Sequence, residues 1–499
     1  MCDAPSTPLV RHAPHAPTIT QLRSLSGVVP RRFAPVLAEV APIARRFRDA
    51  GARLYLVGGS VRDLMLDRDV GGLDFDFTTD ARPDAIRAAL VGWADAVWAP
   101  GERFGTIACR KGARTYEITT HRAEAYASES RKPEVRFADD VRADLSRRDF
   151  TINAMALEVT SDSPELVDPF GGMADLMACV LRTPLSATES FSDDPLRMMR
   201  AARFIATLQV RPVDELVEAV DAMHERITIV SAERVRDEFD RLMVAPQPSL
   251  GLWFLVEHGV CQHFLPEFGA MRLEQDPIHR HKDVLTHTIA VIENVAPDAP
   301  CDLRITRLAA LYHDIGKPRT RQIRPGKGVT FYHHEVVGAR MTRERMRALK
   351  YPAEDVRAVS ELVALTSRFH TYQLGWTDSA VRRYVRDAGP WLRELNVLTR
   401  ADCTTRNERK VAALARRMDE LEARIAEVSA REELAAMRPE LDGVAVMAHL
   451  GIGPGRAVGA ALEHLMEIRL EEGLLGEAEI RSRLDVWWRE HAAEYPPAS

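Results

Sequence analysis

The chain has 499 residues, of which 46% are hydrophobic and 28% charged, and its formal net charge is −6 at pH 7. That length predicts roughly three or more domains, and the charge does not indicate a nucleic-acid binder, so any RNA surface must come from local basic patches. No apolar run approaches the roughly 20 residues needed to cross a bilayer. The Pro-rich residues 1–30 are typical of a disordered tail, and six cysteines without a CxxC pair favour a reducing cytoplasm.

A glycine turn after the first predicted strand indicates an anion site. The apolar run Leu54–Val57 predicts a buried strand. Gly58 and Gly59 follow it and let the backbone approach a ligand, because neither residue carries a Cβ. Ser60 is the expected N-cap of a helix over Val61–Leu66, whose free N–H groups would favour an anion.

An acidic pair lies on the next predicted strand. Asp74 and Asp76 are two residues apart, so on a strand both carboxylates project from one face. Two like charges this close are unfavourable unless a cation or donors compensate them. With Arg62 nearby, the turn and the pair together indicate phosphoryl or nucleotidyl transfer with a bound metal. Each feature alone has a structural alternative, a plain turn and a solvated strand face.

A third carboxylate lies on another predicted strand. Glu117, within Thr115–Thr119, would complete a two-metal site with Asp74 and Asp76 if the strands are neighbours. As a single residue it is equally explained as a solvated glutamate at a strand edge.

The stretch RRDFTINAM joins Arg147 and Arg148 to Asp149 and Asn153. Paired arginines suit triphosphate oxygens because the planar guanidinium binds bidentately. The acid and the amide could hold sugar hydroxyls or orient the arginines. The structural alternative is a helix N-terminus with ordinary surface charges.

The stretch FSDDPLRMMRAARF predicts a helix capped by Ser192, with acids in its first turn as the helix dipole favours. Asp194 and Arg197 are three apart and therefore adjacent on one helix face. Together they offer an acceptor and a fork of donors that could recognise the edge of a base. The helix dipole alone also explains the acids.

Beyond about residue 184 the pattern becomes helical and carries a series of histidines and aspartates. His313 and Asp314 end an apolar helix that Gly316 and Pro318 close. Further His and Asp residues on other helices suit a metal centre inside a helix bundle. The candidate ligands are His287, His313, Asp314, His334, His370 and Asp402. Farther along, the apolar spacing from Val411 to Val428 indicates a helix–helix packing seam, either an internal hairpin or a dimer contact.

These motifs, in this order, resemble those of the class II tRNA nucleotidyltransferases, the CCA-adding enzymes, with bacterial poly(A) polymerases as close kin. GGSVRD with LDFDF matches the metal and triphosphate motif of the family and RRDFTINAM its sugar-recognition motif. DPFGGMADL matches its hinge motif, DDPLR its nucleotide-template motif and ERVRDE its helix-stabilising motif. Asp193 departs conservatively from the Glu that usually opens the template motif.

The resemblance implies an α+β fold with a head containing a small mixed sheet, followed by a helical neck, body and tail. It implies two Mg²⁺ ions on Asp74 and Asp76, and attack of the tRNA 3′-hydroxyl on the α-phosphate of CTP or ATP with release of pyrophosphate. Arg62 and the glycine backbone would hold the triphosphate. The expected nucleotide contacts are Gly58, Gly59, Arg62, Asp63, Arg147, Arg148, Asp149, Asn153, Asp194, Arg197, Arg200 and Arg203.

The histidine series resembles an HD phosphohydrolase domain, which some bacterial CCA enzymes carry between body and tail. His287, His313, Asp314 and Asp402 match its ligands for a divalent metal of open identity, and His334 and His370 match the additional histidines of its two-metal members. The expected domains are a disordered tail over 1–30, a head over 31–184, a neck and body over 185–275, an HD domain over 276–405 and a C-terminal tail over 406–499.

The sequence therefore predicts a cytoplasmic CCA-adding tRNA nucleotidyltransferase with an HD domain, acting on tRNA, CTP and ATP and not on a membrane. The alternatives are a poly(A) polymerase on the same fold and an HD phosphohydrolase whose head only binds RNA. The sequence leaves open whether both C and A are added, whether the HD domain is active, and the oligomeric state.

Overall fold

The computed structural model describes residues 30–68, 74–101, 105–125, 134–273, 283–324, 328–369, 376–405, 407–432 and 437–495. The tail expected over 1–30 falls outside them except for Pro30. The chain forms two compact units, one with the chain up to Val230 and Glu257–Val260, the other with Ser231–Val256 and Cys261–Ser499. Within the described ranges, no helix has the length and apolarity that a membrane crossing requires.

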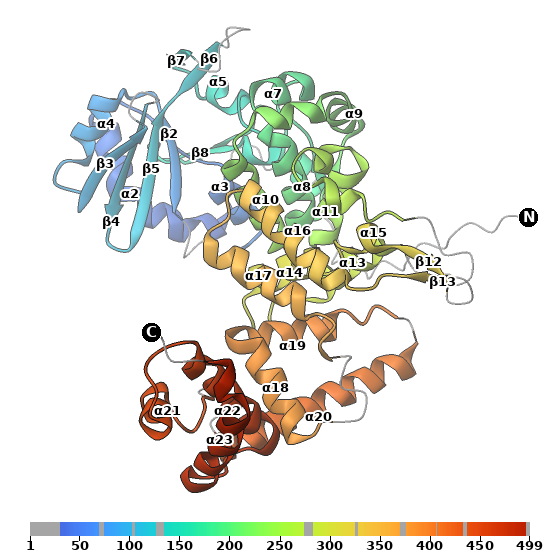
Figure 1. The fold of residues 1–499 in the computed structure, drawn as a ribbon. Helices are drawn as coiled ribbons and strands as arrows, with labels where there is room; N and C mark the ends of the chain where they lie inside the picture. Colours follow the sequence, from blue (N-terminus) through green and yellow to red (C-terminus); the bar gives the residue numbers. More distant parts are fainter. Residues whose placement is uncertain are drawn as a thin grey trace, which may run out of the picture. The chain divides into compact units, whose positions relative to one another are not determined.

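A seven-stranded mixed sheet forms the centre of the first unit (Figure 1). Its strand order is β3–β4–β5–β2–β1–β8–β9, and β2 and β5 are the parallel neighbours. The strands are β1 (Leu54–Val57), β2 (Phe75–Thr79), β3 (Ala96–Gly101), β4 (Thr106–Lys111), β5 (Arg114–Thr120), β8 (Ala156–Glu158) and β9 (Glu165–Val167). The mixed sheet expected for a nucleotidyltransferase head is confirmed.

One face of the sheet is apolar. Phe75 and Phe77 of β2 are buried and pack against Tyr116 of β5, with ring centroids 5.9 and 6.2 Å away. Trp93 adds a further edge contact to Tyr116. The helices α2 (Ala34–Asp49) and α4 (Pro83–Leu90) pack against the sheet (Figure 1). The alternation of β2 therefore turns its acidic residue to the opposite face.

The remaining elements of the first unit are mostly helices. They are η1 (Arg31–Phe33), α3 (Gly59–Met65), β6 (Arg122–Ala125), β7 (Glu134–Phe137), α5 (Val141–Ser146), η3 (Thr151–Asn153), α6 (Gly172–Met177), β10 (Val180–Leu181), α7 (Ala187–Asp193), α8 (Leu196–Leu208), β11 (Arg211–Pro212), α9 (Asp214–Met223) and η4 (His224–Ile229).

The helix expected to open at Ser192 is in fact two helices. Ser192 lies inside α7, which Ser186 caps, and α8 begins only at Leu196. Pro195 disfavours helical backbone at the residue before it, and Asp194 is accordingly extended (φ −140°, ψ 98°). The proline thus separates Asp194 from the helix that carries Arg197.

In its described residues, the second unit is helical apart from one hairpin, β12 (Gln322–Arg324) with β13 (Gly328–Thr330). Its helices are α10 (Ala232–Met243), α11 (Pro248–Glu257, whose last residue belongs to the first unit), η5 (Val260–His263), α12 (Pro266–Gly269), α13 (Val284–Asn294), α14 (Leu303–Tyr312), α15 (Lys317–Thr320), α16 (His334–Ala348), α17 (Ala353–Leu365), α18 (Asp378–Ala388), η7 (Gly389–Trp391), α19 (Leu392–Ala401), α20 (Glu408–Glu432), α21 (Gly443–Leu450), α22 (Arg456–Glu472), α23 (Glu477–His491) and η9 (Ala492–Glu494).

The apolar seam on α20 is an internal contact over much of its length. α20 packs against α18 and α19 of the same chain. Met418, Leu421 and Val428 are fully buried there, whereas Val411 near the start of the helix is 41% exposed.

Candidate active sites

Three carboxylates gather on the polar face of the sheet. Asp76 of β2 lies directly opposite Glu117 in the register of the parallel strands β2 and β5, so both side chains point to the same side. Asp74 immediately precedes β2, and its Oδ1 accepts a hydrogen bond from the backbone N–H of Thr115 (3.2 Å). The structure thus brings together the two predicted metal ligands and the third carboxylate. We call these residues the head carboxylates.

The head carboxylates repel one another. Burial and the nearby charge of Asp74 raise the pKa of Asp76, although Arg148 opposes the shift. Burial and the charges of Asp76 and Asp74 also raise the pKa of Glu117. A divalent cation would relieve this repulsion, and carboxylate oxygens are the ligands that Mg²⁺ prefers.

A cavity of about 220 Å³ lies on this face of the sheet. Asp76 and Glu117 line it together with three arginines, Arg122, Arg147 and Arg148. The cavity therefore has both cation-binding and anion-binding groups, the combination that a metal-bound triphosphate requires.

One buried aspartate holds two of these arginines. Asp144 is 2% exposed, with its carboxylate 3.5 Å from Arg147 Nε and 3.3 Å from Arg148 Nη2. The two arginines lower the pKa of Asp144 against the opposing effect of burial. Asp144 is a positioning residue that the sequence motifs did not indicate.

Gly58 is required by both its conformation and its surroundings. Its φ of +73° and ψ of −136° are disfavoured for residues with a side chain. A Cβ at Gly58 would lie 3.2 Å from Nη1 of Arg148 and 3.9 Å from Oδ2 of Asp76. The glycine turn thus lets Arg148 and Asp76 approach the same stretch of backbone.

Gly58, rather than Ser60, is the N-cap of α3. Ser60 lies within the helix, is 4% exposed, and its predicted capping role is wrong. The positive φ of Gly58 turns the chain straight from β1 into α3, so the helix begins at Gly59, one residue before the serine. A Cβ on Gly59 would lie 3.5 Å from Nη2 of Arg62.

A continuous hydrogen-bond chain connects the glycine-turn helix to α8. Arg62 donates to both carboxylate oxygens of Asp63 (3.0 and 2.8 Å) and to Oδ1 of Asn153 (2.7 Å). Asn153 donates to Oδ1 of Asp149 (3.0 Å), and Nε of Arg200 donates to Oδ2 of Asp149 (2.8 Å). Asp149 and Asn153 are 7% and 6% exposed. Their contacts favour the second role left open by the sequence, the orientation of arginines.

The ion pair between Asp149 and Arg200 remains charged. Burial acts to raise the pKa of Asp149, but the guanidinium of Arg200 outweighs it, with hydrogen bonds from Asn153 and the backbone N–H of Phe150. The resulting pKa is about 2. Asp149 therefore holds Arg200 in place at any physiological pH.

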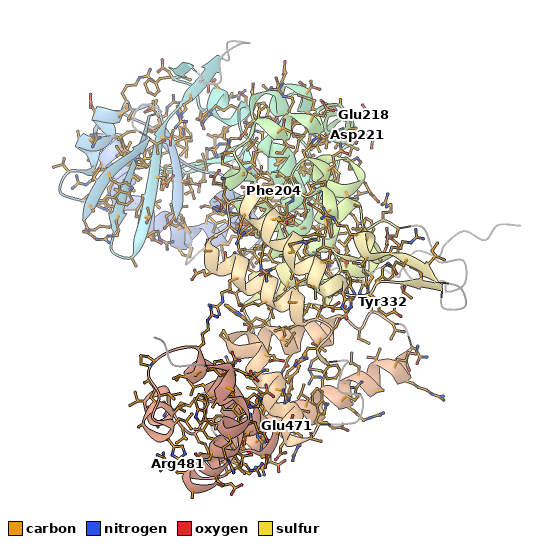
Figure 2. The ribbon with its side chains drawn as sticks, viewed as in Figure 1. Phe204, Glu218, Asp221, Tyr332, Glu471 and Arg481 are labelled. Carbon is orange, nitrogen blue, oxygen red and sulfur yellow. The ribbon has the colours of Figure 1, made fainter. Side chains whose placement is uncertain are left out.

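Phe204 gathers three arginines around one aromatic ring. The guanidinium carbons of Arg62, Arg200 and Arg203 lie 5.3, 5.8 and 4.2 Å from the ring centroid of Phe204. The ring is 3% exposed, and Phe150 makes an edge contact with it at 5.6 Å. Figure 2 labels Phe204 on α8. Cation–π attraction of about 0.5–1 kcal/mol or more per contact offsets repulsion between the three cations.

A second cavity, of about 170 Å³, lies beside Arg147 and Arg148. Asp193 and Arg197 also line it. Nη1 of Arg197 donates to Oγ of Ser190 (2.7 Å), and its Nη2 donates to the carbonyl oxygen of Arg147. Arg197 is therefore fixed against the RRDFTINAM segment.

The regular helix predicted to carry both Asp194 and Arg197 is interrupted at Pro195. Oδ1 of Asp194 accepts from the backbone N–H of Leu196 (3.2 Å), and Asp193 rather than Asp194 is among the described residues that line the second cavity. The break at Pro195 removes the regular helical spacing on which the predicted pairing depended.

A cluster of histidines and aspartates lies in the second unit. His287 comes from α13, His313 and Asp314 follow α14, and Asp402 follows α19. Nε2 of His287 is 2.9 Å from Asp402 Oδ1 and 3.3 Å from Nε2 of His313. Within the described ranges, His287, His313 and Asp402 form the group whose ligand atoms all lie within 4.8 Å of one another. We call His287, His313, Asp314 and Asp402 the HD cluster.

Two further histidines, His334 and His370, were predicted as metal ligands, and the structure describes only the first of them. Nε2 of His334, at the start of α16, is 3.5 Å from Oδ1 of Asp314, so His334 lies at the edge of the HD cluster. His370 lies outside the described residues. A cation is also present beside the cluster, because Nζ of Lys317 donates to Oδ2 of Asp314 (2.6 Å).

Neighbouring oxygens orient the rings of the cluster. Nδ1 of His287 is 2.8 Å from Oγ1 of Thr404, and Nδ1 of His313 is 2.8 Å from the carbonyl oxygen of Ala310. These contacts leave Nε2 of each ring toward the aspartates. Such outer hydrogen bonds fix the tautomer of a metal-ligating histidine.

Gly316 allows the two halves of the cluster to approach. A Cβ at Gly316 would lie 2.1 Å from the carbonyl oxygen of His334 and 2.8 Å from the backbone N of Gly338. Only glycine permits this contact between the turn after α14 and the start of α16. The glycine that the sequence placed at a helix end thus also brings His334 near Asp314.

The HD cluster is neutralised by its own residues. Burial acts to lower the pKa of His313, but Asp314 and Asp402 outweigh it and raise that pKa to about 10. Conversely, His313 and its neighbours outweigh burial and lower the pKa of Asp314, and His287 and His313 do the same for Asp402. Bound metal would have to replace the protons on these rings.

Family models match three parts of the chain. The "Poly A polymerase head domain" matches residues 54–182, the "Probable RNA and SrmB- binding site of polymerase A" matches 213–271, and the "HD domain" matches 284–429. The head carboxylates lie in the first of these regions and the HD cluster in the last.

Relatives resemble the chain over different lengths. An A-adding tRNA nucleotidyltransferase of Deinococcus radiodurans is 33% identical over 444 residues, which covers 87% of this chain and 95% of the relative. A CCA-adding enzyme of Lactobacillus helveticus is 38% identical over 216 residues, covering 43% of this chain and 52% of the relative. The second match therefore spans about half of each protein.

Solved structures share the fold. The match to the CCA-adding enzyme of Bacillus stearothermophilus in complex with CTP covers 93% of this chain and 100% of that enzyme, with a TM-score of 0.64 and 23% identity. The CCA-adding enzyme of Thermotoga maritima in complex with tRNA covers 92% of this chain and 96% of its own, with a TM-score of 0.57 and 18% identity.

Proposed function

This chain belongs to the tRNA nucleotidyltransferase family, and from that membership we propose that it transfers CMP and AMP from CTP and ATP to the 3′ end of tRNA and releases pyrophosphate. The observation that carries the proposal is one cavity in which Asp76 and Glu117 lie together with Arg122, Arg147 and Arg148. Cation ligands beside anion ligands in one cavity support transfer of a metal-bound nucleoside triphosphate.

The nucleotidyltransferase and HD families are both metal-dependent. In the head, Asp74 and Asp76 would hold the metal, with Glu117 beside them, and their oxygen donors suit Mg²⁺. When bound, the metal would supply Lewis-acid stabilisation of charge on the phosphoryl oxygens. The raised pKa of Asp76 and of Glu117 fits ligands that await a cation.

The arginines would hold the triphosphate. Arg148 lies against the Gly58 turn, and Arg62 is oriented by Asp63 and Asn153. Phe204 holds Arg62 close to the arginines of α8. These contacts are made before any substrate binds, so the cost of ordering the arginines is already met in the fold.

The second cavity would receive the base. Cytosine and adenine both offer an exocyclic amine next to a ring-nitrogen acceptor, which a carboxylate beside a guanidinium satisfies. Uracil and guanine reverse this pattern and would leave buried polar groups unpaired, at roughly 1–3 kcal/mol each. Arg197 would supply the donors. Asp193 lines the cavity, and Oδ1 of Asp194 accepts from the N–H of Leu196.

Labelled nucleotides separate the proposal from its alternatives. The purified protein is incubated with tRNA that lacks its 3′-terminal CCA, with tRNA ending in CC, and with each radiolabelled triphosphate in turn. Incorporation of C and then A that stops after one A supports the proposal. Addition of A to tRNA ending in CC, without addition of C to the shorter tRNA, would replace it with an A-adding activity. Long tails of A alone would replace it with poly(A) synthesis.

The HD cluster supports a second activity, metal-dependent hydrolysis of phosphate esters. The observation is the convergence of His287, His313 and Asp402 within 4.8 Å. Release of phosphate from p-nitrophenyl phosphate or of p-nitrophenol from its bis ester is measured after metal removal and after addition of Mn²⁺, Co²⁺, Ni²⁺ or Mg²⁺. A rate that returns with one metal and is absent from His313→Ala supports the activity, and a rate unaffected by either treatment refutes it.

A further inference from the structure

Among the described residues, the end of β2 that carries Asp74 and Asp76 has a paired strand on one side only. β5 pairs with β2 along its whole length, whereas β1 pairs with it only as far as Phe77. Asp74 precedes the first residue of the strand, Phe75. The position of these two carboxylates therefore depends on how β5 holds the start of β2.

The first two residues of β5 both contact this end of β2. The backbone N–H of Thr115 donates to Oδ1 of Asp74 (3.2 Å). The guanidinium carbon of Arg114 lies 4.3 Å from the ring centroid of Phe75, which is fully buried. Because Phe75 lies between Asp74 and Asp76 in the sequence, a shift of Phe75 would move both carboxylates.

Glu39 of α2 fixes the guanidinium of Arg114. Nε of Arg114 donates to Oε1 of Glu39, and its Nη2 donates to Oε2 (3.0 Å). A bidentate pair of this kind fixes the plane of the guanidinium as well as its distance. The same helix is anchored by its buried residues Val36 and Val40. We call Glu39 and Arg114 the Glu39–Arg114 pair.

The Glu39–Arg114 pair acts on the head carboxylates through position rather than through charge. Burial and Asp74 raise the pKa of Asp76, and Arg148 opposes that shift. These effects account for the direction of the shift without a contribution from Arg114. Since Glu39 also neutralises Arg114 at close range, packing is the route by which the pair reaches the carboxylates.

We propose that Glu39 and Arg114 are positioning residues that set the affinity of the head carboxylates for a divalent cation. Carboxylates bind a cation more tightly when their oxygens are already held in the ligand geometry, because less ordering is required on binding. The Glu39–Arg114 pair holds Phe75 from one side, and Thr115 holds Asp74 directly. The inference rests on the proposed function, in which Asp74 and Asp76 hold the metal.

The test compares full-length variants of the pair with a matched ion pair elsewhere on β2. Arg114→Leu removes the guanidinium, Arg114→Lys keeps the charge without the planar face, and Glu39→Gln weakens the bidentate contact. Arg53→Leu is the control, because Arg53 pairs with Asp80 just beyond the other end of β2 (3.3 Å).

Binding of Mn²⁺ is followed by electron paramagnetic resonance, and the head sites are those that Asp76→Ala lacks. Incorporation of C into tRNA lacking its CCA end is measured over a range of Mg²⁺ concentrations. Thermal unfolding is recorded for every variant. Arg114→Lys and Glu39→Gln carry the test if Arg114→Leu unfolds at the assay temperature.

We expect Arg114→Leu to weaken Mn²⁺ binding at the head by roughly tenfold and to raise the half-saturating Mg²⁺ concentration by a similar factor. Incorporation at saturating Mg²⁺ should fall much less, since added metal compensates for the lost affinity. Arg114→Lys and Glu39→Gln should show smaller losses of affinity, and Arg53→Leu none.

Unchanged Mn²⁺ affinity in the variants of the Glu39–Arg114 pair would overturn the proposal. An equal loss of affinity in Arg53→Leu would also overturn it, because the effect would then follow from the stability of the sheet. Full affinity in Arg114→Lys would show that charge and not position matters. Weaker Mn²⁺ binding in Arg114→Leu, with no nucleotide incorporation by the wild-type protein, would refute the proposed function alone.

Discussion

The head carboxylates and the HD cluster both contain acidic side chains, but their surroundings shift the pKa of those carboxyl groups in opposite directions. In the head, burial and mutual repulsion raise the pKa of Asp76 and of Glu117. In the HD cluster, histidines and Lys317 outweigh burial and lower the pKa of Asp314. The head carboxylates therefore repel one another in a way that a bound cation would relieve further than Arg148 does, whereas the HD cluster carries its own cations.

The difference follows from where the ligands come from. Strands β2 and β5 present carboxylates side by side, and the nearby arginines are occupied, Arg148 by Asp144 for example. The HD cluster draws imidazoles and carboxylates from separate helices, so an imidazole nitrogen and a carboxylate oxygen can approach to 2.9 Å. A site of the first kind suits metal that arrives with a substrate, and a site of the second kind suits a resident metal that displaces protons.

The largest expected effect comes from removing a head carboxylate. Asp76→Ala should lower nucleotide incorporation by on the order of a thousandfold or more, because a lost metal ligand removes stabilisation of the transition state. Binding of tRNA should change by less than a few fold. Single-turnover incorporation and tRNA anisotropy measure the two quantities.

The matched comparison is the double variant His313→Ala with Asp314→Ala, which should keep wild-type incorporation and lose any phosphohydrolase activity. Near-normal incorporation by Asp76→Ala would contradict the assignment of the head site. Loss of incorporation by a folded HD variant would contradict the independence of the two sites.

A smaller but still large effect is expected at the glycine turn. Gly58→Ala should destabilise the protein by roughly 1–3 kcal/mol through backbone strain, and the new Cβ should displace Arg148, 3.2 Å away. Gly112→Ala is the control, since Gly112 also has a positive φ (61°) but its Cβ would meet nothing within 4 Å. Incorporation and thermal unfolding are measured for both variants. Equal activity losses in the two would show that strain, and not the position of Arg148, matters.

The cation–π contacts of Phe204 predict an effect on nucleotide binding. Phe204→Leu should raise the KM for CTP and ATP by roughly tenfold, because three cation–π contacts are lost. Phe204→Trp keeps an aromatic face and should retain a KM nearer to the wild-type value. Steady-state kinetics with saturating tRNA distinguish this from a packing effect, which would lower stability for both variants without separating their KM values.

The smallest effect is a difference in pH dependence. In the metal-free protein the pKa of His313 is about 10, so its proton must leave when metal binds, and metal affinity of the HD cluster should rise with pH through the neutral range. Mg²⁺ binding at Asp76 and Glu117 displaces no imidazole proton, so Mg²⁺ affinity of the head should depend less on pH through the neutral range. Titration calorimetry on Asp76→Ala and on the HD double variant isolates each site. Identical pH profiles would remove the contrast between them.

The sequence predicted the positions of several site residues correctly, because the patterns that indicate them are local. The two-residue alternation of a strand predicted that Asp76 lies on the polar face of the sheet. The helix end predicted at Gly316 lies beside the HD cluster. Glu117 required pairing between distant strands, which spacing cannot give and the register of β2 with β5 does.

Contacts between segments that are distant in the chain could not be predicted from local sequence patterns. Asp144 holds two arginines through a buried ion pair, and its own segment gives no sign of that role. Phe204 had a signal in its four-residue spacing from Arg200, but the third cation, Arg62, comes from another helix. The predicted cap at Ser60 was wrong because the positive φ of Gly58 had already started the helix.

The central claim is that the head carboxylates catalyse ordered addition of C and A to tRNA. Its most direct test is sequencing of the 3′ ends of tRNA lacking CCA, after incubation with CTP, ATP and Mg²⁺ and wild-type protein or Asp76→Ala. We predict ends that finish in CCA with the wild-type protein and unchanged ends with the variant. Equal extension by both proteins, or no extension by the wild type, would contradict the claim.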